Sequence, residues 1–172
     1  IYNYSKAYEI NFISLRYFNV SGSDFLNKIG EAHSPETHVI PLALESIKNN
    51  NIFNIYGDDY NTKDGTCIRD FIHVKDLGKA HFLSFKKLLS CKACEFINVG
   101  CGKGFSIYEI LDSAKKITNM GVSTSIVKRR DGDPDILISN IDKAKKFLSW
   151  KPKYSDINSI ISDSWKWHQI YS

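Results

Sequence analysis

The chain has 172 residues, a net charge of +4, 42% apolar residues and 24% charged residues. This composition is typical of one globular domain or one lobe of a larger protein. No apolar run reaches the roughly 20 residues that a membrane span needs, and no signal-peptide pattern opens the chain, so we expect no membrane partner. The lysines are scattered rather than clustered, which argues against nucleic acid as a partner.

Four cysteines, Cys67, Cys91, Cys94 and Cys101, favour reduced thiols in a cytoplasmic protein, although an even number also permits disulfides. Cys91 and Cys94 form a CxxC pair, which is compatible with zinc or redox chemistry. Zinc needs about four ligands, and no second CxxC or His pair has the spacing to supply the rest. We therefore expect no metal site.

The first third of the chain alternates between helix-like and strand-like stretches. In order, the pattern predicts a helix end at residues 1–9, a strand at 11–18, a loop at 19–35, a helix at 36–47 and a strand at 52–56. Pro41 fits the first helical turn, because its missing N–H would be unpaired there anyway. His38, at the helix start, is typical of a cap or a surface residue. Tyr17, Phe18 and Asn19 end a strand, where open α/β sheets bind ligands, although a buried strand end with a turn-forming Asn has the same pattern.

The next stretch, from Tyr56 to His81, has an unusual density of turn residues and charges: YGDDYNTKDGTCIRDFIHVKDLGKAH. Turns are predicted at residues 57–59 and 64–65, and apolar residues then return to the core around Arg69 and Asp70. A buried Arg either pairs with a neighbouring carboxylate or binds an anionic ligand, because an unpaired buried charge is costly. A helix follows, with Asp76 in its first turn and a predicted buried face of Val74, Leu77, His81, Phe85 and Leu88 or Leu89.

The last part of the chain predicts a strand at residues 95–99, a Gly-rich turn at 100–104, a helix after Ser106, a strand at 123–128, and helices at 140–150 and 156–170. Ser106 and Glu109 form a capping box. The turn has GxGxG spacing without an acidic residue about twenty positions later, so we interpret it as structural rather than dinucleotide-binding. The charged run at 128–134 is, on pattern alone, typical of a solvated surface. The last helix is expected to bury Ile157, Ile160, Ile161, Trp165 and His168.

From Gly57 to His81 the chain resembles the UDP-glucose (UDP-galactose) 4-epimerase family of extended short-chain dehydrogenases, in which GxDYxTxDGTxxRDxIHVxDLxxAH is a hallmark. The resemblance implies that Arg69 contacts the diphosphate of a UDP-sugar. It also implies that Tyr56 lies against the uridine, and that Asn54 contacts the nucleotide through its backbone.

Other segments resemble the same family, and the resemblance extends over essentially the whole chain. In the Arg16-Tyr17-Phe18-Asn19 segment it places Tyr17 and Phe18 beside the nicotinamide of NAD and Asn19 on the sugar nucleotide. Further contacts are implied for His38 and Val39 with the uridine, for Arg130 with the diphosphate, and for Asp133 with the uridine ribose. Leu137 falls where the family carries a residue that limits sugar size, and it leaves the acceptance of N-acetylated sugars open.

The resemblance implies the α/β fold of the C-terminal part of an NAD-binding, Rossmann-type extended short-chain dehydrogenase, with its smaller mixed α/β substrate-binding domain. Residues 1–172 would be the UDP-sugar-binding portion, and the dinucleotide-binding part would precede them. Tyr2 and Lys6 have the spacing of the family's catalytic pair. The family has more chain between that pair and the next strand, so we interpret the match as chance and expect no catalytic residue in this chain.

The implied function is that of a fragment of an isomerase that interconverts UDP-galactose and UDP-glucose through a 4-keto intermediate with bound NAD. The chain alone would be inactive, and its parent would be a homodimer. A related UDP-sugar enzyme, such as a UDP-arabinose epimerase or a nucleotide-sugar dehydratase, stays open. So does a non-catalytic UDP-sugar-binding module.

Overall fold

The computed structural model describes every residue except 25, 27 and 172. Its elements are α1 (Tyr2–Tyr8), β1 (Phe12–Tyr17), β2 (Asn19–Ser21), α2 (Val39–Asn49), β3 (Ile52–Tyr56), β4 (Ile68–His73), α3 (Val74–Ser90), β5 (Cys94–Val99), β6 (Gly104–Ser106), α4 (Ile107–Thr118), β7 (Ser123–Val127), β8 (Ile136–Leu137), α5 (Asp142–Leu148) and α6 (Ile157–Tyr171). Mixed helices and strands confirm the predicted α/β class. Among the helices of the described residues, none is both long and apolar enough to cross a membrane.

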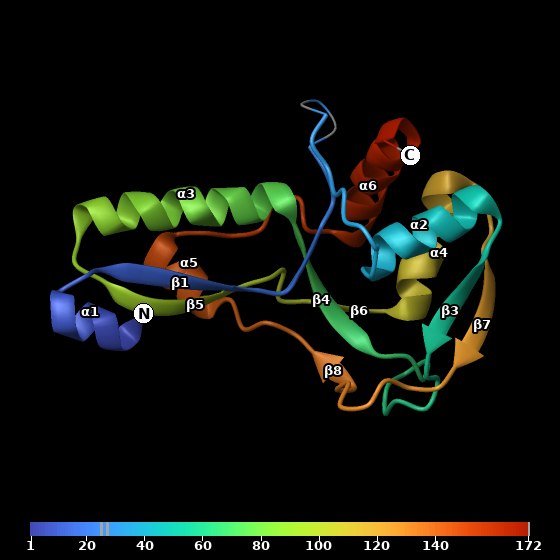
Figure 1. Ribbon diagram of the computed structural model, residues 1–172, viewed down its shortest axis with the longest axis horizontal. Coiled ribbons are helices and arrows are strands. Elements are labelled where there is room, and N and C mark those ends of the chain that lie inside the picture. Colours follow the sequence, from blue (N-terminus) through green and yellow to red (C-terminus); the bar gives the residue numbers. More distant parts are fainter. Residues whose placement is uncertain (25, 27, 172) are drawn as a thin grey trace.

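The molecule is elongated, and its two parts are joined by β4 (Figure 1). In one part, α3 runs along the parallel pair β1 and β5. In the other part, α2, α4 and α6 pack together beside the parallel pair β3 and β7. The connecting strand β4 pairs in parallel with β2 and β8 and antiparallel with β6. The strand pairing is therefore mixed, with parallel pairs in the majority.

Two neighbouring residues of β4 link the two hydrophobic cores. Phe71 is 1% exposed and packs with buried residues of α2, α4 and α6, whereas Ile72 is 0% exposed and packs with α3, β5 and α5. Successive side chains of a strand point to opposite faces. One short strand thus packs into both cores. Arg69, two positions before Phe71 on the same strand, therefore lies at the boundary between them.

The polar part of the hallmark stretch fixes the start of α4. Asp64 accepts hydrogen bonds from the backbone N–H and the hydroxyl of Thr66, and it contacts the hydroxyl of Ser106. The predicted capping box is confirmed: Ser106 accepts from the Glu109 N–H, and the Glu109 carboxylate accepts from the Ser106 N–H. These bonds satisfy helix donors that would otherwise have no partner.

The predicted loop at residues 19–35 is wrong for its first three residues. Asn19–Ser21 form β2, which pairs in parallel with β4 in the register Asn19 to Phe71. The polar residues of this segment resemble a loop, but a partner strand far along the chain supplies their backbone hydrogen bonds. Tertiary pairing has overridden the local propensity.

The predicted buried face of α3 is also partly wrong. Leu77 is buried, but Val74, His81 and Phe85 are exposed, and the residues that pack inward are Asp76, Leu77, Ala80 and Ser84. Two stripes on this helix have the helical period. The buried one carries the small side chains of Ala80 and Ser84, and the helix contacts β1, β4 and α5. Asp76 does more than favour the helix dipole, because its carboxylate accepts hydrogen bonds from the backbone of Lys153 and Tyr154.

Candidate functional site

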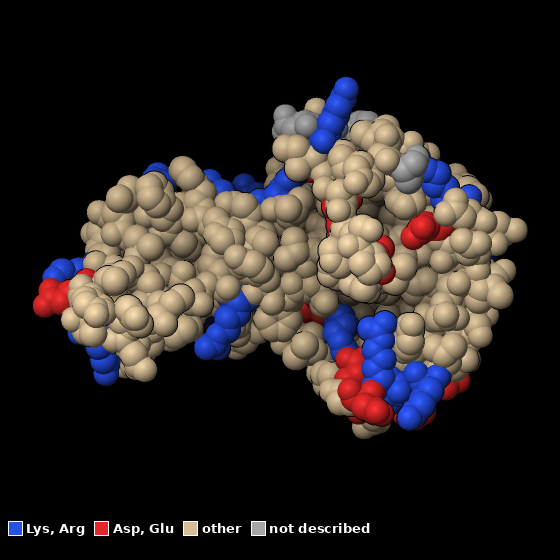
Figure 2. Space-filling view, viewed as in Figure 1, with Lys and Arg blue, Asp and Glu red and all other residues tan. Residues whose placement is uncertain are grey.

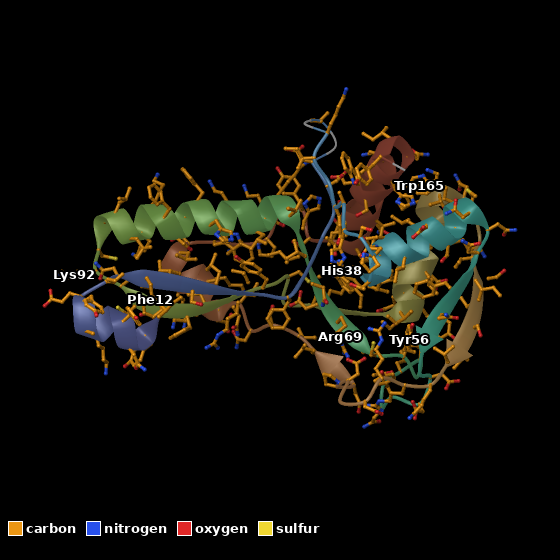
Figure 3. All side chains as sticks on the ribbon, viewed as in Figure 1. Phe12, His38, Tyr56, Arg69, Lys92 and Trp165 are labelled. Carbon is orange, nitrogen blue, oxygen red and sulfur yellow. The ribbon has the colours of Figure 1, made fainter. Side chains whose placement is uncertain are left out.

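Side chains from well-separated parts of the chain meet around one cavity of about 420 Å³. Its lining includes every residue for which the sequence predicted a substrate contact, namely Asn19, His38, Val39, Asn54, Tyr56, Arg69, Arg130 and Asp133. Figure 3 shows His38, Arg69 and Tyr56 in the same region, where α2, β4 and β3 approach one another. The fold therefore brings the predicted set together.

Arg69 is a largely buried charged residue that lines the cavity. It is the second residue of β4, and its side chain is only 12% exposed. The guanidinium pairs with the carboxylate of Asp133 and donates a hydrogen bond to the Ile68 carbonyl at 2.8 Å. The sequence left open whether Arg69 pairs with a carboxylate or binds an anionic ligand, and the structure shows a carboxylate partner. That partner, Asp133, comes from the β7–β8 turn and is not the adjacent Asp70.

Asp133 has a second partner that the sequence analysis missed. The hydroxyl of Tyr60 donates to its other carboxylate oxygen at 3.0 Å. Burial raises the pKa of Tyr60 to about 12, and the neighbouring Asp133 carboxylate adds to the effect. The guanidinium carbon of Arg129 lies 3.8 Å from the centre of the Tyr60 ring. Asp133 is thus held from two sides at the edge of the cavity, with its side chain 27% exposed.

Arg130 has a different environment from Arg69. Its guanidinium carbon lies 4.0 Å from the centre of the Tyr56 ring, an arrangement that favours a cation. Among the described residues, no carboxylate forms an ion pair with Arg130. Figure 2 shows basic and acidic side chains gathered on the surface where the β7–β8 turn lies. Arg130 therefore brings into the cavity a positive charge that an anionic ligand can pair with.

The remaining lining is largely apolar, with Val39, Leu42, Phe53, Phe71 and Ile107. Such a surface suits a flat ring, whereas the two guanidinium groups suit a phosphate, which Arg binds by paired, charge-assisted hydrogen bonds. At the opposite side, the side-chain amide of Asn19 donates to the backbone carbonyl of Asp70 at 2.7 Å. This bond orients the amide at the end of β2.

Cys67 also lines the cavity and was not predicted to do so. Burial is the main cause that raises the pKa of its thiol, so the thiol stays protonated at neutral pH. Cys67 stands two residues before Arg69, and residues two apart along an extended chain point to the same side. That spacing is the signal by which the sequence could have identified it.

A second cavity, of about 700 Å³, adjoins the first and shares with it Asn19, His38, Val39 and Phe71. Tyr17 and Phe18, predicted to lie beside a cofactor, line this second cavity. The hydroxyl of Tyr17 forms a hydrogen bond with Nε2 of His81 at 2.9 Å, which holds the ring at the end of β1. The two predicted groups of residues therefore lie in neighbouring spaces.

The Gly-rich turn at residues 100–104 binds an internal carboxylate. The N–H groups of Cys101 and Gly102 donate to Asp70 at 2.7 and 3.0 Å, and Ser139 donates to it through both its backbone and its hydroxyl. A Cβ at Gly100 would lie 2.6 Å from an oxygen of Asp70, so only glycine fits there. The geometry confirms the interpretation of this turn as structural.

Tyr2 and Lys6 lie close together on α1, with the Lys6 ammonium 4.8 Å from the Tyr2 ring centre. Helix α1 stands at the end of the molecule away from β3, β4 and α2, which surround the first cavity (Figure 1). These two side chains line neither cavity. Their helical spacing therefore places them together without bringing them to the candidate site.

Residues 1–100 match the model of the NAD dependent epimerase/dehydratase family. The chain is 45% identical over 167 residues to a UDP-glucose 4-epimerase of Lactobacillus helveticus, which covers 96% of this chain and 51% of that relative. A UDP-glucose 4-epimerase structure from Brucella ovis in complex with NAD matches with a TM-score of 0.90 and 41% identity over 95% of this chain and 50% of that chain. One from Bifidobacterium longum in complex with NAD⁺ and UDP has a TM-score of 0.88 and 29% identity, over 98% of this chain and 51% of that chain.

The chain thus spans about half the length of the curated relatives and solved structures that it matches. Within that span its α/β fold, with parallel strand pairs, matches NAD-binding epimerase structures of the Rossmann type. The family model covers more than half of the 172 residues, and it includes both β1 and the whole hallmark stretch. The chain belongs to the NAD dependent epimerase/dehydratase family.

Proposed function

We propose that this chain is the UDP-sugar-binding portion of a UDP-glucose 4-epimerase, an NAD-dependent isomerase that interconverts UDP-galactose and UDP-glucose. The observation that carries the proposal is the meeting of Arg69 and Arg130 in one cavity, although 60 residues separate them in the sequence. Relatives with this name, one of them solved with NAD⁺ and UDP, support the same assignment.

In the proposed complex, Arg69 and Arg130 bind the diphosphate, and Asp133 accepts hydrogen bonds from the ribose hydroxyls. Arg69 then exchanges part of its contact with Asp133 for the phosphate, which carries more charge. The uracil lies against Tyr56 and the apolar wall that includes Val39, with the backbones of His38 and Asn54 beside it. Asn19 lines both cavities, so in this complex its side chain lies beside the sugar of the bound nucleotide.

The residues at the second cavity fit one end of NAD. Tyr17 and Phe18 offer ring surface at a strand end, and their cavity adjoins the one proposed for the sugar nucleotide. When bound, NAD supplies the acceptor for a hydride from the fourth carbon of the sugar. The residues of this chain hold the nucleotide firmly at a distance from that carbon, so binding energy on a non-reacting group positions the reacting one.

We further propose that the dinucleotide-binding part and the catalytic Tyr-Lys pair belong to the half of the parent that this chain does not include. Large apolar side chains on the outer side of α3, Phe82, Phe85 and Leu89, are 52%, 61% and 74% exposed, as is expected of a surface that another part of a protein covers. The parent is proposed to be a homodimer in the cytoplasm, where the four free cysteines of this chain would stay reduced.

Calorimetric titration with UDP, followed by UDP-glucose and UDP-galactose, tests the proposed site. We expect Arg69→Ala and Arg130→Ala to weaken UDP binding, whereas Arg16→Ala, an exposed arginine on β1, should leave it unchanged. Unchanged affinity in both cavity variants would rule out the diphosphate site.

A turnover assay separates an enzyme fragment from a binding module. The complete parent should consume UDP-galactose, and this chain alone should not. Turnover by the 172-residue chain would mean that Tyr2 and Lys6 were wrongly excluded, and an inactive parent that still binds UDP would favour a non-catalytic module.

A further inference from the structure

The loop that leads into α2 carries a group of imidazole and carboxylate side chains of the kinds that metals bind. Only one of them, His38, has been assigned a role so far. The group consists of Glu31, His33, Glu36 and His38, and we call it the histidine-glutamate cluster. Nδ1 of His33 lies 3.7 Å from Oε1 of Glu36, and Nδ1 of His38 lies 3.3 Å from the same oxygen. Oε1 of Glu31 contacts Nδ1 of His38 from the other side. Both imidazoles therefore direct the same ring nitrogen toward one carboxylate.

The separations of the two Nδ1 atoms from Oε1 of Glu36, 3.7 Å for His33 and 3.3 Å for His38, match the edges of a metal coordination polyhedron. A tetrahedral Zn²⁺ ion with bonds of about 2.0–2.2 Å to nitrogen and oxygen separates its ligand atoms by roughly 3.4 Å. The ligand atoms of His33, Glu36 and His38 all lie within 4.8 Å of one another, and no other group of three potential ligand residues in the described part of the chain meets this condition. An ion could enter with small side-chain shifts.

The loop is held in place by contacts outside the cluster. The indole N–H of Trp167 on α6 donates to the backbone carbonyl of Glu31 at 2.7 Å. The backbone at Gly30 lies against the same indole, since a Cβ there would be 2.3 Å from the ring. On the other side, the Glu36 carboxylate accepts from the N–H groups of Thr37 and His38, each at 2.7 Å. Held in this way, the ligand atoms lose little freedom when an ion binds.

The charge and the exposure of the cluster also suit a cation. The Glu36 carboxylate, with the Glu31 carboxylate beside His38, offsets the charge of a divalent ion. Neutral imidazoles are common ligands of Zn²⁺, Ni²⁺ and Co²⁺. The His33 and His38 side chains are 49% and 58% exposed, which leaves a route from solvent, whereas those of Glu31 and Glu36 are 26% and 15% exposed.

We propose that the histidine-glutamate cluster binds one divalent transition-metal ion of the Zn²⁺ class. From the sequence we expected no metal site, because no second CxxC or His pair has the spacing to complete a zinc site with Cys91 and Cys94. His38 lines both cavities, so a bound ion would fix its ring at the boundary between the two spaces. The inference does not depend on the proposed nucleotide function.

Titration of the 172-residue chain with Co²⁺, followed by visible absorption, and with Zn²⁺, followed by calorimetry, tests the proposal. We expect one ion per chain, with an absorption spectrum typical of nitrogen and oxygen ligands. His33→Ala and Glu36→Gln should each weaken binding at least about tenfold, as the loss of a metal ligand requires. The double variant Cys91→Ser/Cys94→Ser is the control and should bind as the wild type does.

Three outcomes would overturn the proposal: no binding at micromolar protein, binding that survives His33→Ala, or binding lost with the cysteine pair and accompanied by thiolate absorption bands. Circular dichroism of each variant shows that it is folded, which is expected because the His33 side chain is half exposed. His33 lines neither cavity, so UDP affinity of His33→Ala should stay unchanged. Failure of the metal site and failure of the nucleotide site are therefore distinguishable.

Discussion

Two carboxylates in this chain, Asp70 and Asp133, have opposite environments. Asp70 is 0% exposed, and its partners are neutral donors from Cys101, Gly102 and Ser139. Asp133 is 27% exposed, faces a cavity and pairs with Arg69.

These two environments decide which of the two regions can bind a ligand. The N–H groups of the Gly-rich turn already bind an internal anion, and displacing it would leave a buried charge without partners. Arg69 sits at an open cavity beside a second guanidinium and can exchange one oxygen ligand for another. A turn that resembles a phosphate-binding loop is therefore structural, whereas an apparent surface charge cluster is the candidate site.

The largest effect is expected when the buried Asp70 carboxylate is removed. Asp70→Ala removes the acceptor of several buried donors, each of which costs about 1–3 kcal/mol when left unsatisfied. We expect the free energy of unfolding, measured with urea, to fall by about 3 kcal/mol or more. Asp112→Ala, at an exposed position of α4, is the matched control and should change it by less than about 0.5 kcal/mol. A small effect of Asp70→Ala would show that water replaces the carboxylate.

Substitutions at the cavity around Asp133 should act mainly on ligand binding. Arg69→Ala is expected to weaken UDP binding by about 2–4 kcal/mol, or roughly 30- to 1,000-fold, because it removes a largely buried charge and leaves Asp133 without its ion pair. Arg130→Ala should cost less, about 1–2 kcal/mol, because Arg130 lies on the Tyr56 ring without a carboxylate partner among the described residues. Calorimetry gives both values. An equal effect of the two substitutions would contradict the distinction drawn between them.

The stability of the chain at alkaline pH tests the environment of Tyr60 without any ligand. Its pKa is raised from 10.0 to about 12 in the folded chain, first by burial and then by Asp133. The folded state therefore keeps a proton that the unfolded state loses near pH 10, so stability falls as pH rises from about 10 to 12. Urea unfolding at these pH values should show a loss of about 2 kcal/mol in the wild type relative to Tyr60→Phe. Parallel pH profiles of the two proteins would rule out this coupling.

The smallest effect is expected for UDP binding by Tyr60→Phe. The substitution removes the hydroxyl that holds one oxygen of Asp133 but keeps the ring under Arg129. Affinity should fall by about 1 kcal/mol, or roughly fivefold, since one hydrogen bond to a charged group is lost. Tyr108→Phe, on α4, is the matched control, because Tyr108 neither lines the cavity nor, among the described residues, forms a hydrogen bond with Asp133. An effect as large as that of Arg69→Ala would mean that Tyr60 contacts the ligand itself.

Much of the local structure was predictable from the sequence. The capping box at Ser106, the strand at 52–56 and the helix that begins near Pro41 depend on contacts within a few residues, and the structure confirms them. The eight predicted contact residues could be named by resemblance to a family, and the fold brings them to one cavity. Their roles toward a ligand stay predictions until the titrations are made.

Other features could not be predicted from local sequence, because they depend on contacts with distant parts of the chain. Asn19–Ser21 became a strand because β4 pairs with it, and α3 turned its small residues inward because β1, β4 and α5 lie on that side. Tyr60 at the site, and the convergence of Glu31, His33, Glu36 and His38, likewise followed from no pattern that the sequence predictions used. Cys67 could have been identified from its two-residue spacing to Arg69.

The sequence by itself determined most of the helices and strands and the turn residues that separate them, because these follow from backbone propensities and side-chain periods over a few residues. The charged residues of the candidate site were named by resemblance to a known family. Only the tertiary structure decided which carboxylate Arg69 pairs with and which anion the Gly-rich turn encloses. Such choices depend on burial and on groups that lie 31 to 69 residues apart in the chain, and local pattern contains no information about either.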